Sequence, residues 1–336
     1  MCGSWKAALL GAVVITAVGP AAAWSVLFGA SSAASDHDRA SNGVHVGPEW
    51  LAGDGAADAA RLVMSLHGLG LRTVYADLGV IDPVGDVARR GADGARVSMD
   101  ERAAGAFLQD MQRAAPEIRV LPVLGGQLGR DVRPADVEQQ VGIAQTAALL
   151  VDGGARGVHV AVTGTSTSTP GFVPLVRRVK AELGDAVVSV RGGLPGAAGE
   201  TLDGLAALCA EADALVVPMH GTGAQTRLGY EARVAWATRR LAETLPAAEE
   251  GGCAWSLEVP TVDLPAFDHD PRVETLSGAL AGIRRGLGDA PVPVGFAGVV
   301  LEDSRTTSVR EWGSYEAGWR GRSGSGITVP GGPDGV

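Results

Sequence analysis

The chain has 336 residues, of which 46% are hydrophobic and 20% are charged, proportions typical of a folded protein with a sizeable core. Its formal net charge is -10 and its pI is about 5.1. Binding to a phosphate backbone needs clustered lysine and arginine, and no basic stripe occurs along the sequence. Nucleic acid is therefore not expected as a partner.

An uncharged apolar stretch lies near the start of the chain, from Ala7 to Ser35, with Lys6 before it and Asp36 after it. A membrane-spanning helix needs about 20 apolar residues, and the apolar core of a secretory signal has about 7–15. We therefore expect residues 1–35 to form a transmembrane anchor or a signal segment, and we favour the anchor. The rest of the chain is then expected outside the cytoplasm, as a single-pass protein of the cell membrane or, after cleavage, as a secreted protein.

Composition divides the remainder into a linker at residues 36–43, a domain at 44–320 and a flexible Gly/Ser/Pro-rich tail at 321–336. Within the domain, Val-rich runs recur regularly. Their near-continuous apolar content is typical of parallel strands that are covered on both faces. The predicted strands are Gly43–Gly47, Thr73–Gly79, Arg119–Gly125, Gly157–Gly164, Ala186–Arg191, Ala214–His220, Ala254–Pro260 and Gly298–Asp303.

A helical pattern follows each run. The predicted helices are Ala56–Leu69, Asp100–Ala114, Pro134–Val151, Phe172–Leu183, Thr201–Glu211, Glu231–Thr244, Val273–Leu287 and Val309–Trp319. Ser98 and Glu101 have the spacing of a capping box at the start of one helix. Eight strand–helix units in succession predict an α/β protein with a (β/α)₈ TIM barrel. An open doubly wound sheet is the alternative.

Three cysteines, Cys2, Cys209 and Cys253, give no disulfide framework. Only Cys209 and Cys253 are candidates to pair in an oxidising compartment. We favour the alternative, in which both are small, buried, unpaired residues.

Polar side chains at the C-terminal ends of the predicted strands define the candidate site, because active sites of TIM barrels lie there. Glycoside hydrolysis uses two carboxyl groups that flank one bond. Glu258 and Glu302, on adjacent strands, are the candidate catalytic pair; each alternatively has a structural role. The candidate binding residues are Asp77, Thr163, Thr165 and His220, and Gln127, Arg191 and Asp303 are the other polar residues at strand ends.

No cluster of His, Cys and Asp has metal-ligand spacing, so neither a metal nor another cofactor is expected. His45 and His159 lie within strands and are expected to be packing residues. The tryptophans Trp50, Trp255 and Trp312 either stack on sugar rings or pack in the core, and we favour packing.

The order and content of these segments resemble family 18 glycoside hydrolases, the chitinase-like barrels, and particularly their divergent membrane-anchored bacterial relatives. The resemblance covers most of Val44 to Trp319. Gly157–Thr163 occupies the place of the family's fourth strand, and Pro218–Thr222 that of the sixth, which carries Met-x-Tyr-Asp. Ala254–Pro260 resembles the seventh strand, and Gly295–Val300, with Glu311 and Trp312 downstream, resembles the eighth.

The departures from the family pattern bear on activity. In the family the fourth strand ends in Asp-x-Glu, where the glutamic acid protonates the glycosidic oxygen and the aspartate orients the substrate N-acetyl group. The resemblance puts Ala161 at the aspartate, Thr163 at the glutamate and His220 near the sixth-strand tyrosine. General acid catalysis contributes about 10²–10⁴-fold, and a threonine hydroxyl cannot supply it at neutral pH. The resemblance therefore implies a degenerate motif without ordinary chitinase activity.

Three hypotheses follow for the function. The first is an envelope-anchored protein that binds a glycan or a cell-wall polysaccharide and has lost the usual catalytic acid. The second is an active glycoside hydrolase that uses Glu258 and Glu302. The third is a scaffold for another envelope protein, which a large exposed apolar patch would favour.

Overall fold

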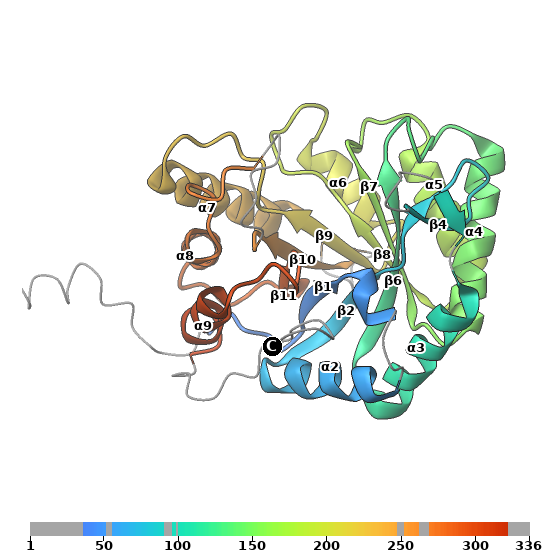
Figure 1. The fold of residues 1–336 in the computed structure, drawn as a ribbon. Coiled ribbons are helices and arrows are strands. Elements are labelled where there is room, and N and C mark those ends of the chain that lie inside the picture. The colour runs from blue at the N-terminus through green and yellow to red at the C-terminus, as the bar shows by residue number, and fades with distance from the viewer. Residues whose placement is uncertain are drawn as a thin grey trace, which may run out of the picture.

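The computed structural model describes residues 36–51, 56–90, 96–98, 100–246, 252–261 and 269–321. In this part of the chain, eight parallel strands close into a barrel in the order β1-β11-β10-β9-β8-β7-β6-β2 (Figure 1). The closed barrel confirms the predicted (β/α)₈ fold and excludes the open sheet. The strands are β1 (Asn42–Val46), β2 (Leu71–Asp77), β6 (Arg119–Gln127), β7 (Gly157–Thr163), β8 (Val187–Arg191), β9 (Ala214–Pro218), β10 (Ala254–Val259) and β11 (Phe296–Leu301).

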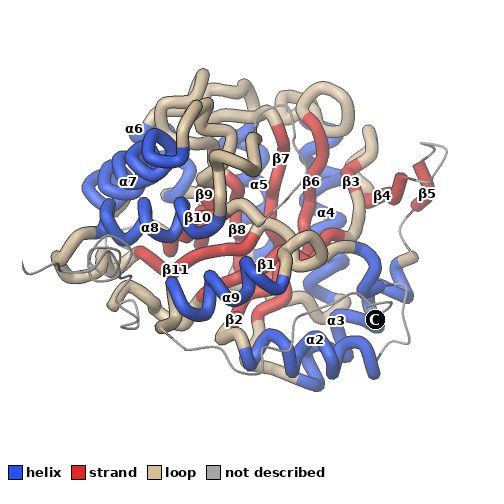
Figure 2. Tube along the Cα trace, turned by 60° about the vertical axis from the view of Figure 1, so that its left-hand side comes forward, coloured by secondary structure: helices blue, strands red, loops and turns tan. Residues whose placement is uncertain are grey.

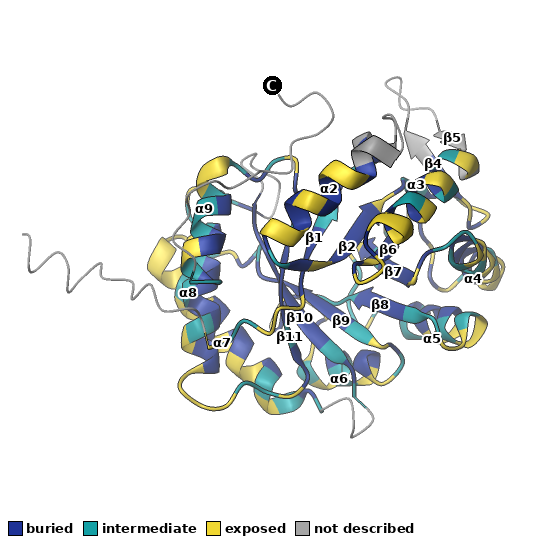
Figure 3. Cartoon of the chain, turned by 90° about the horizontal axis from the view of Figure 1, so that it is seen from below, coloured by how far each residue is buried: buried dark blue, intermediate teal, exposed yellow. Residues whose placement is uncertain are grey.

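Helices surround the barrel, each with its apolar side against the strands (Figure 3). On α8, for example, Leu276, Leu280, Ile283 and Leu287 recur at helical spacing and are buried. Burial of these stripes between helix and strand forms the main hydrophobic core. The helices are α2 (Ala56–Gly68), α3 (Glu101–Ala114), α4 (Val137–Asp152), α5 (Phe172–Leu183), α6 (Leu202–Cys209), α7 (Arg227–Thr244), α8 (Leu276–Leu287) and α9 (Val309–Gly318), and a short 3₁₀ helix, η1 (Pro48–Leu51), follows β1.

Side-chain caps fix where several helices begin. The predicted capping box at Ser98 is wrong: Ser98 lies in a short strand, and Asp100 caps α3 by accepting hydrogen bonds from the backbone N–H groups of Arg102 and Ala103. A capping box is formed instead at α9 by Ser308 and Glu311. The helix start therefore follows the nearest well-placed acceptor rather than the motif spacing alone.

A small antiparallel sheet interrupts the barrel pattern between β2 and α3 and was not predicted. It comprises β3 (Val80–Ile81), β4 (Val87–Arg90) and β5 (Arg96–Ser98), and it lies at the periphery of the barrel (Figure 2). Its β3–β4 turn packs on α4, where Gly85 and Gly142 approach so closely that a side chain on either would overlap backbone atoms of the other segment. Thr146 donates a hydrogen bond to the Gly85 carbonyl in the same contact. This contact holds the start of the excursion, Gly79 and Val80, beside the open end of the barrel.

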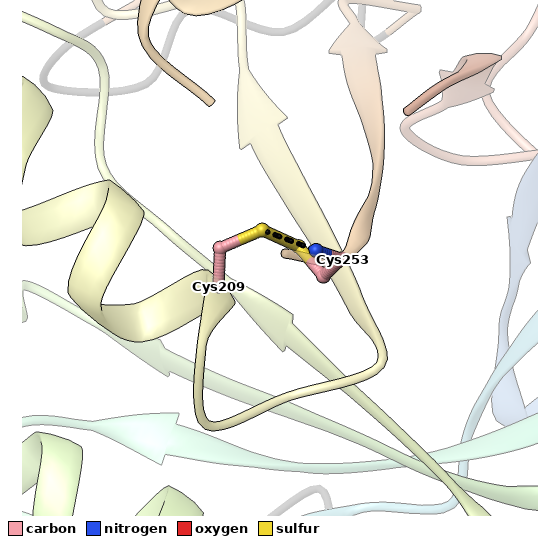
Figure 4. The surroundings of a disulfide bond; sticks show 2 residues. All are labelled: Cys209 and Cys253. Atoms are coloured by element: carbon pink, nitrogen blue, oxygen red, sulfur yellow. Dashed lines mark hydrogen bonds between the residues drawn. A yellow bond between two sulfur atoms is a disulfide. The ribbon is translucent and has the colours of Figure 1, made fainter. Parts of the chain in front are cut away.

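Cys209 and Cys253 are joined by a disulfide bond (Figure 4). Their Cα atoms lie 5.2 Å apart, and both residues are buried at the N-terminal end of the barrel, Cys209 at the end of α6 and Cys253 just before β10. Our expectation of two unpaired cysteines is therefore wrong. Two segments separated by 44 residues meet there because the barrel places β9 and β10 side by side.

The predicted N-terminal anchor or signal, residues 1–35, and the tail beyond residue 321 lie outside the described residues. Within the described ranges, no helix combines the length and the apolar character that crossing a bilayer requires. The barrel begins with β1 at Asn42, slightly earlier than the predicted end of the linker at residue 43.

Candidate functional site

A cavity of about 910 Å³ opens at the C-terminal end of the barrel. Its wall is formed by the ends of β1, β2, β6, β7, β8 and β10, by residues that follow β1 and β6, by the first residues of the β2–β3 excursion, and by the segment after β11. Seven of the predicted polar residues contribute to the wall: Asp77, Gln127, Thr163, Arg191, Glu258, Glu302 and Asp303.

Glu258 is the central charge of the site. Its side chain is only 3% exposed, yet it contacts three basic side chains from other strands. The Arg191 guanidinium donates to Glu258 Oε1 at 2.8 Å, and His220 Nε2 lies 3.1 Å from the same oxygen. Burial by itself would raise the pKa of Glu258, but Arg191 and the two nearby histidines hold that pKa well below its usual value. Glu258 is therefore an ionised carboxylate at neutral pH.

Glu302 lies beside the ionised Glu258, but the surroundings of its side chain are different. The Glu302 side chain is 25% exposed, and its Oε1 lies 3.5 Å from His220 Nε2. Burial, together with the negative charge of Glu258, raises the pKa of Glu302, although His220 and Arg191 oppose the shift. Its Oε2 is buried and has no hydrogen-bond partner among the described residues. Two carboxyl groups whose pKa values are shifted in opposite directions, that of Glu258 lowered and that of Glu302 raised, thus share the wall of the cavity.

His220 lies between these two carboxyl groups at the end of β9. Burial lowers the pKa of its imidazole, but the hydrogen bond with Glu258 and the charges of both glutamates raise it above its ordinary value overall. Its Nε2 also lies 2.9 Å from Arg191 Nη2. His220 therefore belongs to the charge cluster beneath the cavity.

Aromatic rings fill the barrel interior below Glu258. His45 stacks on Tyr75 with ring centroids 4.9 Å apart, and His159 meets Tyr75 edge-on at 4.7 Å. His159 is fully buried and its Nδ1 lies 2.9 Å from Ser189 Oγ, as expected for a packing residue. His45 also lines the cavity, and its Nε2 lies 3.5 Å from Glu258 Oε2, so the expectation that it only packs is wrong.

His220, Glu258 and Glu302 also have the donor types of a metal site. One potential ligand atom from each lies within 4.8 Å of the others, a grouping that the sequence spacing did not predict. However, the Arg191 guanidinium already contacts both Glu258 Oε1 and His220 Nε2. A cation at the same two atoms would meet like-charge repulsion, so we assign no metal here.

The remaining predicted residues divide by position. Asp77 and Thr163 are exposed in the cavity, and Asp77 Oδ1 accepts a hydrogen bond from the Gly79 backbone. The Thr165 hydroxyl instead donates to the carbonyl of Val162 in its own loop. The Asp303 carboxylate accepts from the Arg305 backbone and lies 3.5 Å from the Arg305 guanidinium.

Trp50, Trp255 and Trp312 are all buried in the core, which confirms packing over stacking on a sugar.

Sequence reasoning missed several wall residues: His45, Arg130, Asp131 and Arg305. His45 is the penultimate residue of β1, so the rule that selected the other strand-end residues applies to it. The other three lie in loops after β6 and β11, where only the folded chain shows that they turn toward the cavity.

Comparisons with known proteins support the fold. No family model matches the sequence, and no curated protein matches it either. A candidate chitinase A from Streptomyces coelicolor has a TM-score of 0.53 at 13% identity, covering 84% of this chain and 98% of that one. The xylanase and alpha-amylase inhibitor protein XAIP-II from Scadoxus multiflorus has a TM-score of 0.52 at 12% identity, covering 82% and 98%.

A family GH18 chitinase from Cycas revoluta, solved as a complex with allosamidin, has a TM-score of 0.50 at 12% identity and covers 82% of this chain and 97% of its own. Identities this low establish a common fold and leave the chemistry of the site to be argued from this chain. The chain therefore has the barrel fold of family 18 chitinases and chitinase-like proteins, as its sequence predicts.

Proposed function

We propose that this chain is an extracytoplasmic glycan-binding protein of the chitinase-like barrel type, without the catalytic acid of chitinases on its fourth barrel strand. The observation that carries the proposal is the cavity of about 910 Å³ at the C-terminal end of the barrel. Its wall presents carboxylate, amide and hydroxyl groups, from Asp77, Gln127 and Thr163, which can hydrogen-bond sugar hydroxyls. The volume is within the range of ligand sites in proteins.

The end of the fourth barrel strand supports the loss of the acid. Ala161 and Thr163 both line the cavity at the end of β7. They are two residues apart on the strand, so their side chains point to the same face. The resemblance to the family implies that a methyl group and a hydroxyl group replace the two carboxyl groups of the motif. The cavity then keeps hydrogen-bonding capacity at that strand but no proton donor there.

The charges of the wall favour an uncharged glycan over an acidic one. Each arginine that lines the cavity contacts an acidic neighbour: Arg130 with Asp131 at 3.2 Å, Arg191 with Glu258 at 2.8 Å and Arg305 with Asp303 at 3.5 Å. An acidic glycan would have to compete with these pairs for the arginines. A chito-oligosaccharide, which the resemblance to chitinases suggests, avoids that competition.

The extracytoplasmic location is supported by two independent features. The disulfide between Cys209 and Cys253 is typical of proteins in oxidising compartments. The uncharged stretch from Ala7 to Ser35 has the composition of an anchor or signal segment. We propose attachment to the cell membrane through that stretch.

Saturable binding of labelled chitohexaose by the full chain in detergent tests the proposal. We expect Asp77→Asn to weaken binding about five-fold or more, because hydrogen bonds to a charged acceptor are about twice as strong as neutral ones. The amide keeps an oxygen that can still accept from the Gly79 backbone. Glu182→Gln, at an exposed position on α5, is the matched control and should bind like the wild type. Absence of saturable binding, or equal weakening in both variants, would contradict a glycan site in this cavity.

A further inference from the structure

We propose that Glu302 is the proton donor for hydrolysis of a glycosidic bond held in this cavity, with Glu258 as the fixed negative charge beside it. This places a catalytic acid directly after the eighth barrel strand instead of on the fourth. The proposal rests on glycan binding at the same cavity, and the experiment below separates failure of binding from failure of catalysis.

The register of the last two strands aims both side chains at the cavity. β10 and β11 are parallel, with Glu258 paired to Val300, so Glu302 is two residues beyond the partner of Glu258. Because side chains alternate along a strand, residues two apart point to the same face. Both glutamates line the cavity, and a carboxyl oxygen of each lies within 4.8 Å of the other.

The contacts and exposure of the two glutamates indicate which one is the fixed charge and which one is the acid. Glu258 is almost fully buried and its Oε1 is engaged by Arg191 and His220, which fits a positioning charge and leaves little room for attack on a sugar. Glu302 is one-quarter exposed toward the cavity, within reach of a bound glycan. Glu302 is therefore the accessible carboxyl group of the pair.

The surroundings of Glu302 raise the pKa of its carboxyl group. Its Oε2 is buried without a hydrogen-bond partner among the described residues, and burying a carboxylate oxygen in that state is costly. The groups that face it are Glu258, which opposes a second negative charge, and Arg191, His220 and His269, which favour one. Burial of Glu302 and the negative charge of Glu258 together outweigh the effect of the basic groups. The pKa of Glu302 is therefore raised toward the range useful for a general acid.

The reaction needs no group beyond water. Glu302 transfers its proton to the glycosidic oxygen as the bond between that oxygen and the anomeric carbon breaks, and the leaving sugar departs as an alcohol. A water molecule then adds to the anomeric carbon and gives a proton to the Glu302 carboxylate, which restores the acid. Glu258 keeps its charge throughout and is not bonded to the sugar.

Two substrates with different leaving groups test the acid role of Glu302. We expect the full chain to cleave labelled chitohexaose, and Glu302→Gln to lower kcat/KM for it by about 10²–10⁴-fold, the usual contribution of a general acid. The same variant should lose far less activity on a 2,4-dinitrophenyl chitobioside, because dinitrophenolate departs without being protonated. Glu182→Gln is again the matched control and should keep wild-type activity on both substrates.

A pH profile then tests the role of Glu258. Glu258→Gln removes a negative charge beside Glu302, so the pKa of Glu302 should fall and the alkaline limb of kcat/KM should move to lower pH. A merely structural role of Glu258 would reduce activity without moving that limb.

The possible outcomes are distinguishable. Chitohexaose binding without measurable turnover by the wild type overturns the catalytic inference and leaves the binding proposal intact. Absence of binding overturns both. Turnover that is unchanged in Glu302→Gln, or reduced equally for both substrates, removes Glu302 as the acid.

Discussion

Replacing Arg191 by alanine is expected to lower the free energy of unfolding by about 3 kcal/mol, the lower end of the range for breaking a buried ion pair. Glu258 is 3% exposed and cannot regain the solvation of bulk water when the guanidinium is removed. The loss stays at the lower end because Arg191 is itself 21% exposed and water from the cavity can enter its place. Urea unfolding of the wild type and of Arg191→Ala at pH 7 measures the difference.

A surface ion pair provides the matched control. Arg177 and Glu211 make a two-point contact between α5 and the end of α6, but both are at the surface. Arg177→Ala is expected to lower the free energy of unfolding far less than Arg191→Ala, as is usual for exposed pairs. If the two alanine variants lose the same free energy of unfolding, the ion pair between Arg191 and Glu258 contributes no more than a surface ion pair, contrary to what its burial indicates.

The cost of removing Arg191 should depend on pH. The folded-state pKa of Glu258 is depressed, so its contribution is present above the unfolded pKa, near 4.5, and is lost as the pH falls toward the folded value. Below about pH 4.5 the unfolded chain takes up the proton first, and the stability gap between the wild type and Arg191→Ala should narrow. The same unfolding experiment at pH 3 tests this, and a gap that widens would contradict the assignment of Glu258 as the ionised partner.

Removing the disulfide is expected to produce the other large loss of stability. The bond closes a loop with a sequence separation of 44 residues, and the entropy of closing such a loop in the unfolded chain corresponds to about 4 kcal/mol. A Cys209→Ala, Cys253→Ala double variant should therefore unfold at a markedly lower urea concentration than the oxidised wild type.

Reductant is the control for this prediction. It should bring the wild type close to the double variant and leave the double variant unchanged. Three free thiols per chain in the oxidised, unfolded wild type, instead of the single thiol of Cys2, would show that Cys209 and Cys253 are not paired and would remove one support for an extracytoplasmic location.

The strand–helix repeat could be predicted from the sequence because each element is encoded locally. The run Gly157–Thr163 is continuously apolar apart from His159 and its last residue, and it forms β7 as predicted. The short strands β3, β4 and β5 escaped prediction because they have only two to four residues each and no extended apolar run. Their position depends on the close contact between Gly85 and Gly142, which are distant in sequence.

The candidate site was predictable only in part. The rule that barrel sites form at strand ends selected Asp77, Thr163, Glu258 and Glu302, all of which line the cavity. It could not indicate which carboxyl group would be sealed and which exposed. Arg191 and His220, from β8 and the end of β9, lower the pKa of Glu258, whereas burial and the negative charge of Glu258 raise the pKa of Glu302.

The sequence by itself determined the eight strand–helix units, the chitinase-like fold and the strand ends at which a site forms, because apolar periodicity and strand polarity act over short stretches of chain. The tertiary structure decided the pairing of Cys209 with Cys253, the place of His45 in the cavity and the unequal burial of the two glutamates. These depend on distances between segments far apart in the chain, which closure of the barrel alone fixes. Electrostatic and covalent contacts act over a few ångströms, so the chemistry of the site is set only once the strands are in register.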